Sequence, residues 1–167
     1  MVSNAQKPIY APVVGHHNIY KSGSVSRWHN TPDIPAQTVA DHQCRVAQII
    51  FFFWPSASAK LIYAALHHDC GELWVGDVPA PMKRENKKLA YMLEQAEADA
   101  RVGMGIVPFR TDSPKLIFAD RLEAFSYASM NCPDLLGKPE WQQALKDLGE
   151  MADALGVSDR LVDWLNP

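Results

Sequence analysis

The stretch that decides the fold is Ala59–Glu72, AKLIYAALHHDCGE, an apolar segment that runs directly into a group of ionisable residues. Its apolar residues lie on several sides of a helical wheel, which predicts a central, buried helix over residues 59 to about 71. Ionisable groups are costly in such a helix unless they are paired or bind a metal. On a helix, Glu72 shares a face with His68, four residues earlier, and Asp69, three residues earlier. This face indicates either boundary residues or a functional centre.

Helical patterns continue on both sides of this stretch. Thr38 and Asp41 form a variant capping box, and apolar residues then recur at helical spacing up to Pro55. Turn-forming residues occupy 74–81 and predict a loop. Further helices are expected over Lys83 to Arg101 (charged and amphipathic), from Asp112 and Pro114 to about Met130, over about Glu140 to Leu155, and over Ser158 to Leu165. No useful strand-like alternation and no repeat appear, so the predicted class is all-α.

The length of 167 residues suits a single domain with one hydrophobic core. Residues 1–35 are rich in Pro, Gly, Ser and His without a clear period, and we expect an extended or looping N-terminal arm that carries Arg27 and Trp28. Residues 36–130 would form the helical core that carries the chemistry. Residues 131–167 would add the C-terminal helices.

Charge, cysteine content and hydropathy exclude several classes of protein. The net charge of −3 offers no basic surface for a nucleic-acid polymer, which favours a small soluble partner. Three cysteines without a C-x-x-C pair argue against a disulfide framework and a zinc ribbon. Met1–Tyr20 has no apolar segment typical of a secretory signal. The longest apolar stretch, Val46–Trp54, is far short of the ~20 residues of a membrane helix. We therefore expect a cytoplasmic protein without a membrane partner.

Two further polar residues interrupt apolar helical patterns. His42 lies between Val39 and Val46, and Asp120 lies inside the apolar run Leu116–Leu122. Each alone would be an ordinary boundary histidine or an aspartate paired with an arginine. Together with His68 and Asp69 they indicate a shared centre. Two histidines and two aspartates suit one divalent transition metal (Zn, Co, Mn or Ni) with positions left for water and substrate.

Four segments in this order resemble the HD-domain metal phosphohydrolases, over about residues 24–130. They are Arg27-Trp28-His29, Thr38–His42, Ala65–Glu72 running into Gly76–Lys83, and Phe118–Ala124. A bare His-Asp pair is a weak signal, whereas G-E and G-D-x-P-x-P-x-K after it are specific. The closer similarity is to the small bacterial 5′-deoxynucleotidases and their phage relatives. Those relatives include the dATP triphosphohydrolases that accompany 2-aminoadenine genomes.

The resemblance implies a compact HD-domain helical bundle and a role for each matching residue. It implies that the metal ligands are His42, His68, Asp69 and Asp120. It implies that Glu72 is the general acid or base and Asp77 a second acid near the scissile phosphate. It implies that Arg27 and Lys83 bind phosphate, and that Trp28 packs on the sugar and favours 2′-deoxy substrates.

Three positions depart from the family pattern or leave alternatives. Asp41 replaces the usual Glu before the first ligand, where its role resembles helix capping. His67 adds a second imidazole beside His68, but the adjacency of Asp69 fixes the ligand register on His68. His29 is either a substrate contact or a surface residue.

The first expected function is a metal-dependent dATP-type triphosphohydrolase, because Arg27–Pro32 and Gln37–Ala40 are more similar to the phage relatives. The alternative is a 5′-deoxynucleotidase acting on deoxynucleoside monophosphates. A triphosphate substrate would add Mg²⁺ and would favour extra cations near the site, for which Arg84, Lys87, Lys88 and Lys115 are available. A more remote alternative is a non-catalytic nucleotide-binding HD domain, which retention of the ligands and Glu72 disfavours. The expected partners are a small deoxynucleotide and further copies of the chain in a homo-oligomer, in the host cytoplasm if phage-encoded.

Overall fold

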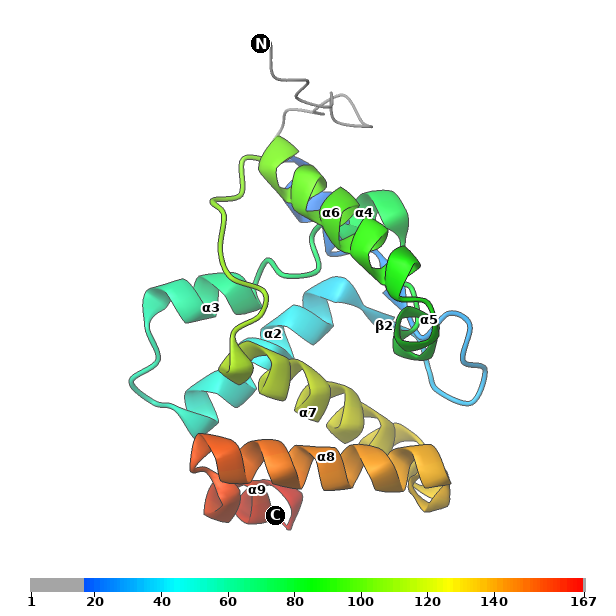
Figure 1. Cartoon of the computed structure of the whole chain (residues 1–167), viewed down its shortest axis with the longest axis vertical. Coiled ribbons are helices and arrows are strands. Elements are labelled where there is room, and N and C mark those ends of the chain that lie inside the picture. Colours follow the sequence, from blue (N-terminus) through cyan, green and yellow to red (C-terminus); the bar gives the residue numbers. More distant parts are fainter. Residues whose placement is uncertain (1–16, 167) are drawn as a thin grey trace.

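The computed structural model describes residues 17–166, so the part of the predicted arm before residue 17 lies outside the described residues. The chain is mainly helical, as the sequence predicts (Figure 1). Its helices are α1 (His17–Ser22), α2 (Val39–Phe53), α3 (Ala59–Ala65), α4 (Glu72–Val75), α5 (Ala80–Glu85), α6 (Lys87–Gly103), α7 (Pro114–Asn131), the 3-10 helix η1 (Pro133–Gly137), α8 (Pro139–Leu155) and α9 (Ser158–Leu165).

The core lies where α2, α7 and α8 pack together. In Figure 1, α8 runs across one side of α7, and α9 lies beyond it, while α4, α5 and α6 lie at the other end. Phe118 of α7 is fully buried, and its ring centroid lies 5.0 Å from that of Phe53 of α2. Leu148 and Ala152 bury the inner face of α8 against the same cluster. This packing fixes α2 and α7 relative to each other, and both carry predicted site residues.

The prediction of one long, central helix over residues 59–71 is wrong. The helix α3 ends at Ala65, residues 66–71 form consecutive turns, and Leu66 is 41% exposed. Nδ1 of His67 bonds the Tyr63 carbonyl oxygen at 2.7 Å, and Nδ1 of His68 bonds the Ala65 carbonyl oxygen at 2.8 Å. These side chains satisfy carbonyls at the helix end, where the backbone leaves them without partners. The central helices are therefore α2 and α7.

Most other helix predictions are confirmed, with one helix divided. The loop predicted over residues 74–81 is shorter than expected, because α4 ends at Val75 and α5 begins at Ala80. The predicted N-cap Thr38 accepts a hydrogen bond from the Asp41 amide at 3.2 Å, and α2 follows. The expected single helix over residues 83–101 is instead α5 and α6. The break is at Asn86, whose side chain accepts a bond from the Leu89 amide at 3.0 Å. A capping asparagine offers the backbone an alternative to continuing the preceding helix.

Two short elements lie inside the segment that was expected to be irregular. Helix α1 occupies part of it, and β1 (Ser26–Arg27) pairs antiparallel with β2 (Gln37–Thr38). The register places Arg27 opposite Gln37. Two-residue strands are too short to show a period of two, which is why the sequence pattern did not reveal them. Within residues 17–166, no helix combines the length and apolar character needed to cross a membrane.

Candidate metal centre and active site

Three of the predicted metal ligands lie together. His42 comes from the first half of α2, and His68 and Asp69 come from the turns after α3. Nε2 of His42 lies 3.2 Å from Nε2 of His68, and Oδ2 of Asp69 lies 3.4 Å from each of these nitrogens. One ligand atom from each residue therefore lies within 4.8 Å of the others, a grouping that could hold a metal ion.

Asp120 approaches the same point from α7. Its Oδ1 lies 3.1 Å from Nε2 of His42 and 3.9 Å from Nε2 of His68. The two histidines and two aspartates come from three different parts of the fold, as the sequence predicts for a shared centre. Asp120 is 40% exposed at its side chain, whereas His42 is fully buried. The centre therefore lies at the boundary between the core and solvent.

The donor set fits a divalent cation. Nδ1 of His42 lies 2.6 Å from Oε2 of Glu123, and Nδ1 of His68 lies 2.8 Å from the Ala65 carbonyl oxygen. An acceptor at each Nδ1 assigns the ring proton to that nitrogen, so in the neutral rings both Nε2 atoms present lone pairs. Two lone pairs and two carboxylate oxygens facing one point repel one another unless a proton or a cation lies between them. Imidazole and carboxylate ligands suit Zn, Co, Mn or Ni.

The charged groups of this cluster stabilise the protonated form of His42 and the ionised forms of Asp69 and Asp120. Burial and the charge of Arg27 lower the pKa of His42, but bonds to Asp120 and Glu123 and the charge of Asp69 outweigh them and raise it to about 9. Burial would raise the pKa of Asp69, yet His68, Arg27 and His42 together lower it. The pKa of Asp120 is also well below its usual value, because bonds to the two histidines outweigh burial. Both aspartates are thus held as carboxylates.

Glu72 is a buried carboxyl beside this centre, at the first position of α4. Burial, followed by the charges of Asp69 and Asp77, raises its pKa to about 10. Its Oε2 has no hydrogen-bond partner among the residues that the structure describes. A protonated, unpaired carboxyl is suited to give a proton to a bound ligand. Asp77 follows α4, and its Oδ2 accepts a long bond of 3.4 Å from the Trp28 amide.

Arg27 reaches the centre from β1. One of its terminal nitrogens, NH1, donates to Oδ2 of Asp69 at 2.6 Å, and the guanidinium is mostly buried. Its Nε has no partner within residues 17–166. A guanidinium can bind a phosphate with two parallel hydrogen bonds, so free donor positions here suit a phosphate ligand.

Trp28 has the backbone strain that often accompanies a functional site. Its φ of 62° is in the left-handed region, which non-glycine residues rarely adopt. Its ring packs 6.3 Å from the ring of Trp141, in an apolar cluster with Ile34 and Leu135. The indole Nε1 is buried and finds no acceptor in the described part of the chain. The indole nitrogen is therefore a buried donor that the described residues leave unsatisfied.

Other candidate residues lie outside the ligand cluster. Nζ of Lys83 is 3.7 Å from Oε1 of Glu97, and within residues 17–166 Lys83 forms its ion pair with this residue and not with the candidate ligands. The His67 ring stacks on Tyr63 at 4.2 Å, so the structure agrees with the choice of His68 as the ligand. Nδ1 of His29 lies 3.1 Å from the Ser26 carbonyl oxygen on the exposed surface.

The residues that support the candidate ligands were not predicted from the sequence. Glu123 contacts His42, and Gln37 donates to Glu123 at 2.7 Å. Arg101 donates to the His68 carbonyl oxygen at 2.7 Å. Glu123 lies in the motif segment Phe118–Ala124, three residues after Asp120. This helical spacing places the two side chains on one face, and it could have indicated that Glu123 lies near the centre. Asp41 also differs from expectation, because its carboxylate contacts Gln37 and not a backbone amide.

The amide of Gln43 supports the turns that carry His68 and Asp69. In the orientation that pairs each donor with an acceptor, its nitrogen donates to the Leu66 carbonyl oxygen at 3.1 Å. Its oxygen then accepts from the Asp69 amide at 3.3 Å. Gln43 follows His42 directly in α2, so one helix supplies a candidate ligand and also fixes the segment that holds two others.

The sequence of the chain is similar to that of known proteins. Residues 17–106 match the family described as 5′-deoxynucleotidase YfbR-like. A 5′-deoxynucleotidase of Citrobacter koseri is 23% identical over 113 residues, which cover 62% of this chain and 56% of that relative. The chain therefore spans only about half the length of the relative. The family match includes His42, His68 and Asp69 but ends before Asp120. Because the match covers more than half of the chain, the protein belongs to the 5′-deoxynucleotidase YfbR-like family of HD-domain proteins.

Proposed function

We propose that the protein is a metal-dependent 5′-deoxynucleotidase that hydrolyses deoxynucleoside 5′-monophosphates to a deoxynucleoside and phosphate. The observation that carries this proposal is the approach of His42, His68, Asp69 and Asp120 to one point, beside the guanidinium of Arg27. We propose these four side chains as the ligands of one divalent metal. When bound, such an ion supplies Lewis acidity toward a phosphate oxygen and lowers the pKa of water.

The side chains around the centre have distinct proposed roles. Arg27 exchanges its bond to Asp69 for bonds to the phosphate, and so offsets the negative charge that develops there. The P–O5′ bond breaks as a water oxygen bonds to phosphorus. Glu72, which is protonated at neutral pH because its pKa is raised to about 10, gives its proton to the leaving O5′. Asp77 orients the attacking water and receives its proton.

Two further residues would bind the substrate. The half-buried indole of Trp28 packs on the deoxyribose. Its ring lies 6.3 Å from the ring of Trp141, and its backbone amide donates to Asp77. A bulky ring at this place leaves little room for a 2′-hydroxyl. Lys83 lies farther out and is paired with Glu97, so we propose that it contributes charge to the phosphate side without contacting the metal ligands.

A monophosphate is the better substrate proposal than dATP, which was the first expectation from the sequence. The matching family and the curated relative are both described as 5′-deoxynucleotidases. A triphosphate also needs several cations near the site. Lys115, one of the available cations, lies over the ring of Trp54 at 4.9 Å and is occupied there. These observations support the release of a single phosphate.

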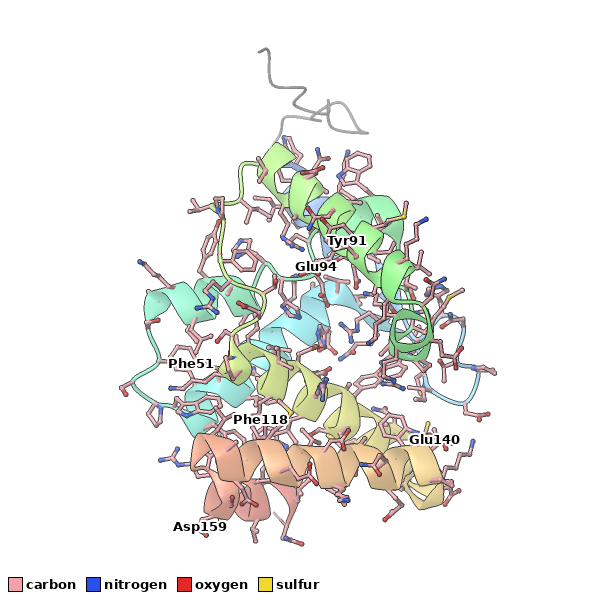
Figure 2. All side chains as sticks on the ribbon, viewed as in Figure 1. Phe51, Tyr91, Glu94, Phe118, Glu140 and Asp159 are labelled. Atoms are coloured by element: carbon pink, nitrogen blue, oxygen red, sulfur yellow. The ribbon has the colours of Figure 1, made fainter. Side chains whose placement is uncertain are left out.

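The test is hydrolysis of each dNMP, the matching NMP and the matching dNTP by metal-stripped protein reloaded with Co²⁺ or Mn²⁺. Phosphate should be released from dNMPs, with weaker activity on NMPs. Asp69→Ala should lose metal and activity together, while Asp159→Ala on the exposed surface of α9 should keep both (Figure 2). Release of intact triphosphate from dNTPs would instead support the triphosphohydrolase function that was first expected from the sequence. Full activity of Asp69→Ala would refute the metal site.

A further inference from the structure

We propose that Glu123 and Gln37 are positioning residues that hold His42 as a metal ligand and align it with the strand that carries Arg27. Neither residue is among the ligands or the acid–base groups proposed above. The inference rests on the proposed metal site and adds the side chains that orient it. It also accounts for a buried carboxylate that the proposed reaction does not otherwise use.

Glu123 is a buried charge with both oxygens engaged. It is 2% exposed, its Oε2 lies 2.6 Å from Nδ1 of His42, and its Oε1 accepts from Nε2 of Gln37 at 2.7 Å. A carboxylate that accepts the Nδ1 proton of a ligating histidine fixes the ring orientation. It also makes Nε2 a stronger donor to the metal. Burial of Glu123 without such a role would be costly, because an isolated charge loses its hydration.

The spacing of α7 places this support next to a ligand. Asp120 and Glu123 are three residues apart on the helix, so their side chains share a face. His42 lies between them, with Nε2 3.1 Å from Asp120 and Nδ1 2.6 Å from Glu123. One helix therefore contacts both nitrogens of the same buried ring. A shift of α7 would displace a candidate ligand and the orienting group of another together.

Gln37 extends this support to the phosphate side. It is buried, and its Nε2 also lies 3.0 Å from Oδ2 of Asp41. Across the two-stranded ladder Gln37 is paired directly with Arg27. Residues directly opposite each other in an antiparallel pair place their side chains on the same face. The two-stranded ladder therefore fixes the position of Gln37, which contacts Glu123, relative to Arg27, which contacts Asp69.

The first test replaces the carboxylate with an amide of the same shape. Glu123→Gln should weaken Co²⁺ or Zn²⁺ binding by about 10- to 100-fold, measured by competition with a chromophoric chelator. The Co²⁺ absorption spectrum should also change, because the His42 ring is no longer fixed. Glu94→Gln, on the exposed face of α6, is the matched control and should bind like the wild type (Figure 2). Affinity of Glu123→Gln within about twofold of the wild type would overturn the proposal.

Exchanging the side-chain types of Gln37 and Glu123 separates two effects: the negative charge next to His42, and the hydrogen bond between residues 37 and 123. In Glu123→Gln alone, two amides face each other and one donor is left unpaired, so some loss of thermal stability is expected. The triple variant Gln37→Glu/Asp41→Asn/Glu123→Gln restores an amide–carboxylate pair but leaves the amide against His42. Asp41→Asn is included because Oδ2 of Asp41 lies 3.0 Å from Nε2 of Gln37 and would otherwise face a second carboxylate. The triple variant should recover thermal stability in the metal-free form without recovering metal affinity. If Glu123→Gln alone does not fold, the metal affinity of the exchanged variant tests the proposal.

The outcomes distinguish this inference from the proposed function. Recovery of wild-type metal affinity in the exchanged variant would mean that Glu123 is only a structural partner, and the inference would be wrong. The proposed nucleotidase would survive that result. A wild-type protein that binds none of these metals would refute the metal site itself, and the positioning role with it.

Discussion

Metal binding should displace a proton from His42, and the pH dependence of affinity should show it. The pKa of His42 in the metal-free protein is raised from 6.5 to about 9, since Asp120, Glu123 and Asp69 outweigh burial and Arg27. At pH 7.5 the ring is therefore charged, whereas a ligating imidazole must be neutral. The proton lost is the one on Nε2, because Nδ1 keeps its proton toward Glu123. About one proton should leave per metal, and Kd should fall about tenfold per pH unit between pH 7 and 8.5.

Calorimetry in buffers of different ionisation enthalpy measures this release directly. The slope of the observed enthalpy against buffer enthalpy gives the number of protons. Glu72 should keep its proton at pH 7.5, because its pKa is raised to about 10. Wild type and Glu72→Gln should therefore each release about one proton. A larger release by the wild type would show that Glu72 is ionised in the metal-bound protein and is not the proton donor.

The same shift sets the sign of the pH dependence of stability. Between pH 6.5 and 9 the folded, metal-free protein holds a proton on His42 that the unfolded chain has lost. The free energy of unfolding should therefore fall as pH rises through this window, by at most about 1.4 kcal/mol per unit from this group. A Kd that is independent of pH, with no proton release in any buffer, would show that His42 is neutral. It would refute the electrostatic account of the cluster.

Other substitutions test separate parts of the structure. Glu72→Ala should keep the metal bound, measured by metal analysis, while turnover of a dNMP falls by about 10²-fold or more. Gly71→Ala should lose about 1–3 kcal/mol in denaturant unfolding, because its Cβ would lie 2.6 Å from the Glu97 backbone. Gly149→Ala is the control: a Cβ there meets nothing within 4 Å, and the helix should gain about 1 kcal/mol. Phe118→Ala should lose about 3–5 kcal/mol, because the ring is fully buried between α2 and α7 (Figure 2). Equal stability of the last variant and the wild type would contradict the proposed core.

The sequence predicts the helices well where a cap and a long periodic pattern coincide. Thr38 marks the start of α2 because its side chain satisfies a backbone amide that the helix leaves free. Pro114 marks the start of α7 because a proline needs no amide partner at the first helical turn. These are local signals, and they do not depend on how distant parts of the chain meet.

The end of α3 could not be predicted in this way. Two neighbouring histidine side chains bond the Tyr63 and Ala65 carbonyl oxygens, and these bonds end the helix that the apolar pattern would extend. Histidine is not an established stop signal by itself, so periodicity favoured a longer helix. Asp69 still lies beside His68, and its charge acts on Glu72, since turns bring residues three or four apart close together as a helix does.

The supporting side chains depend on tertiary contacts, which a single sequence does not show. Glu123 looks like a surface glutamate until α2 is packed against α7 and His42 becomes its partner. Gln37 lies in a strand of two residues, and its contact with Glu123 joins positions 86 residues apart. Motif spacing can indicate ligands because metal chemistry restricts the residue types. The orienting residues can be of many types, and so they leave a weaker trace.

The position of Asp120 links the core to the candidate metal centre. The family match ends at residue 106, whereas α7 begins at Pro114, so residues 17–106 alone would supply His42, His68 and Asp69 without the fourth proposed ligand, Asp120. Phe118, two residues before Asp120, packs against Phe53 of α2, and this contact helps to fix the part of α7 that carries the Asp120 carboxylate. The ring of Phe118 and the carboxylate of Asp120 therefore depend on one placement of α7. A metal that binds all four side chains stabilises this packing, since any ligand that binds only the folded state raises its stability.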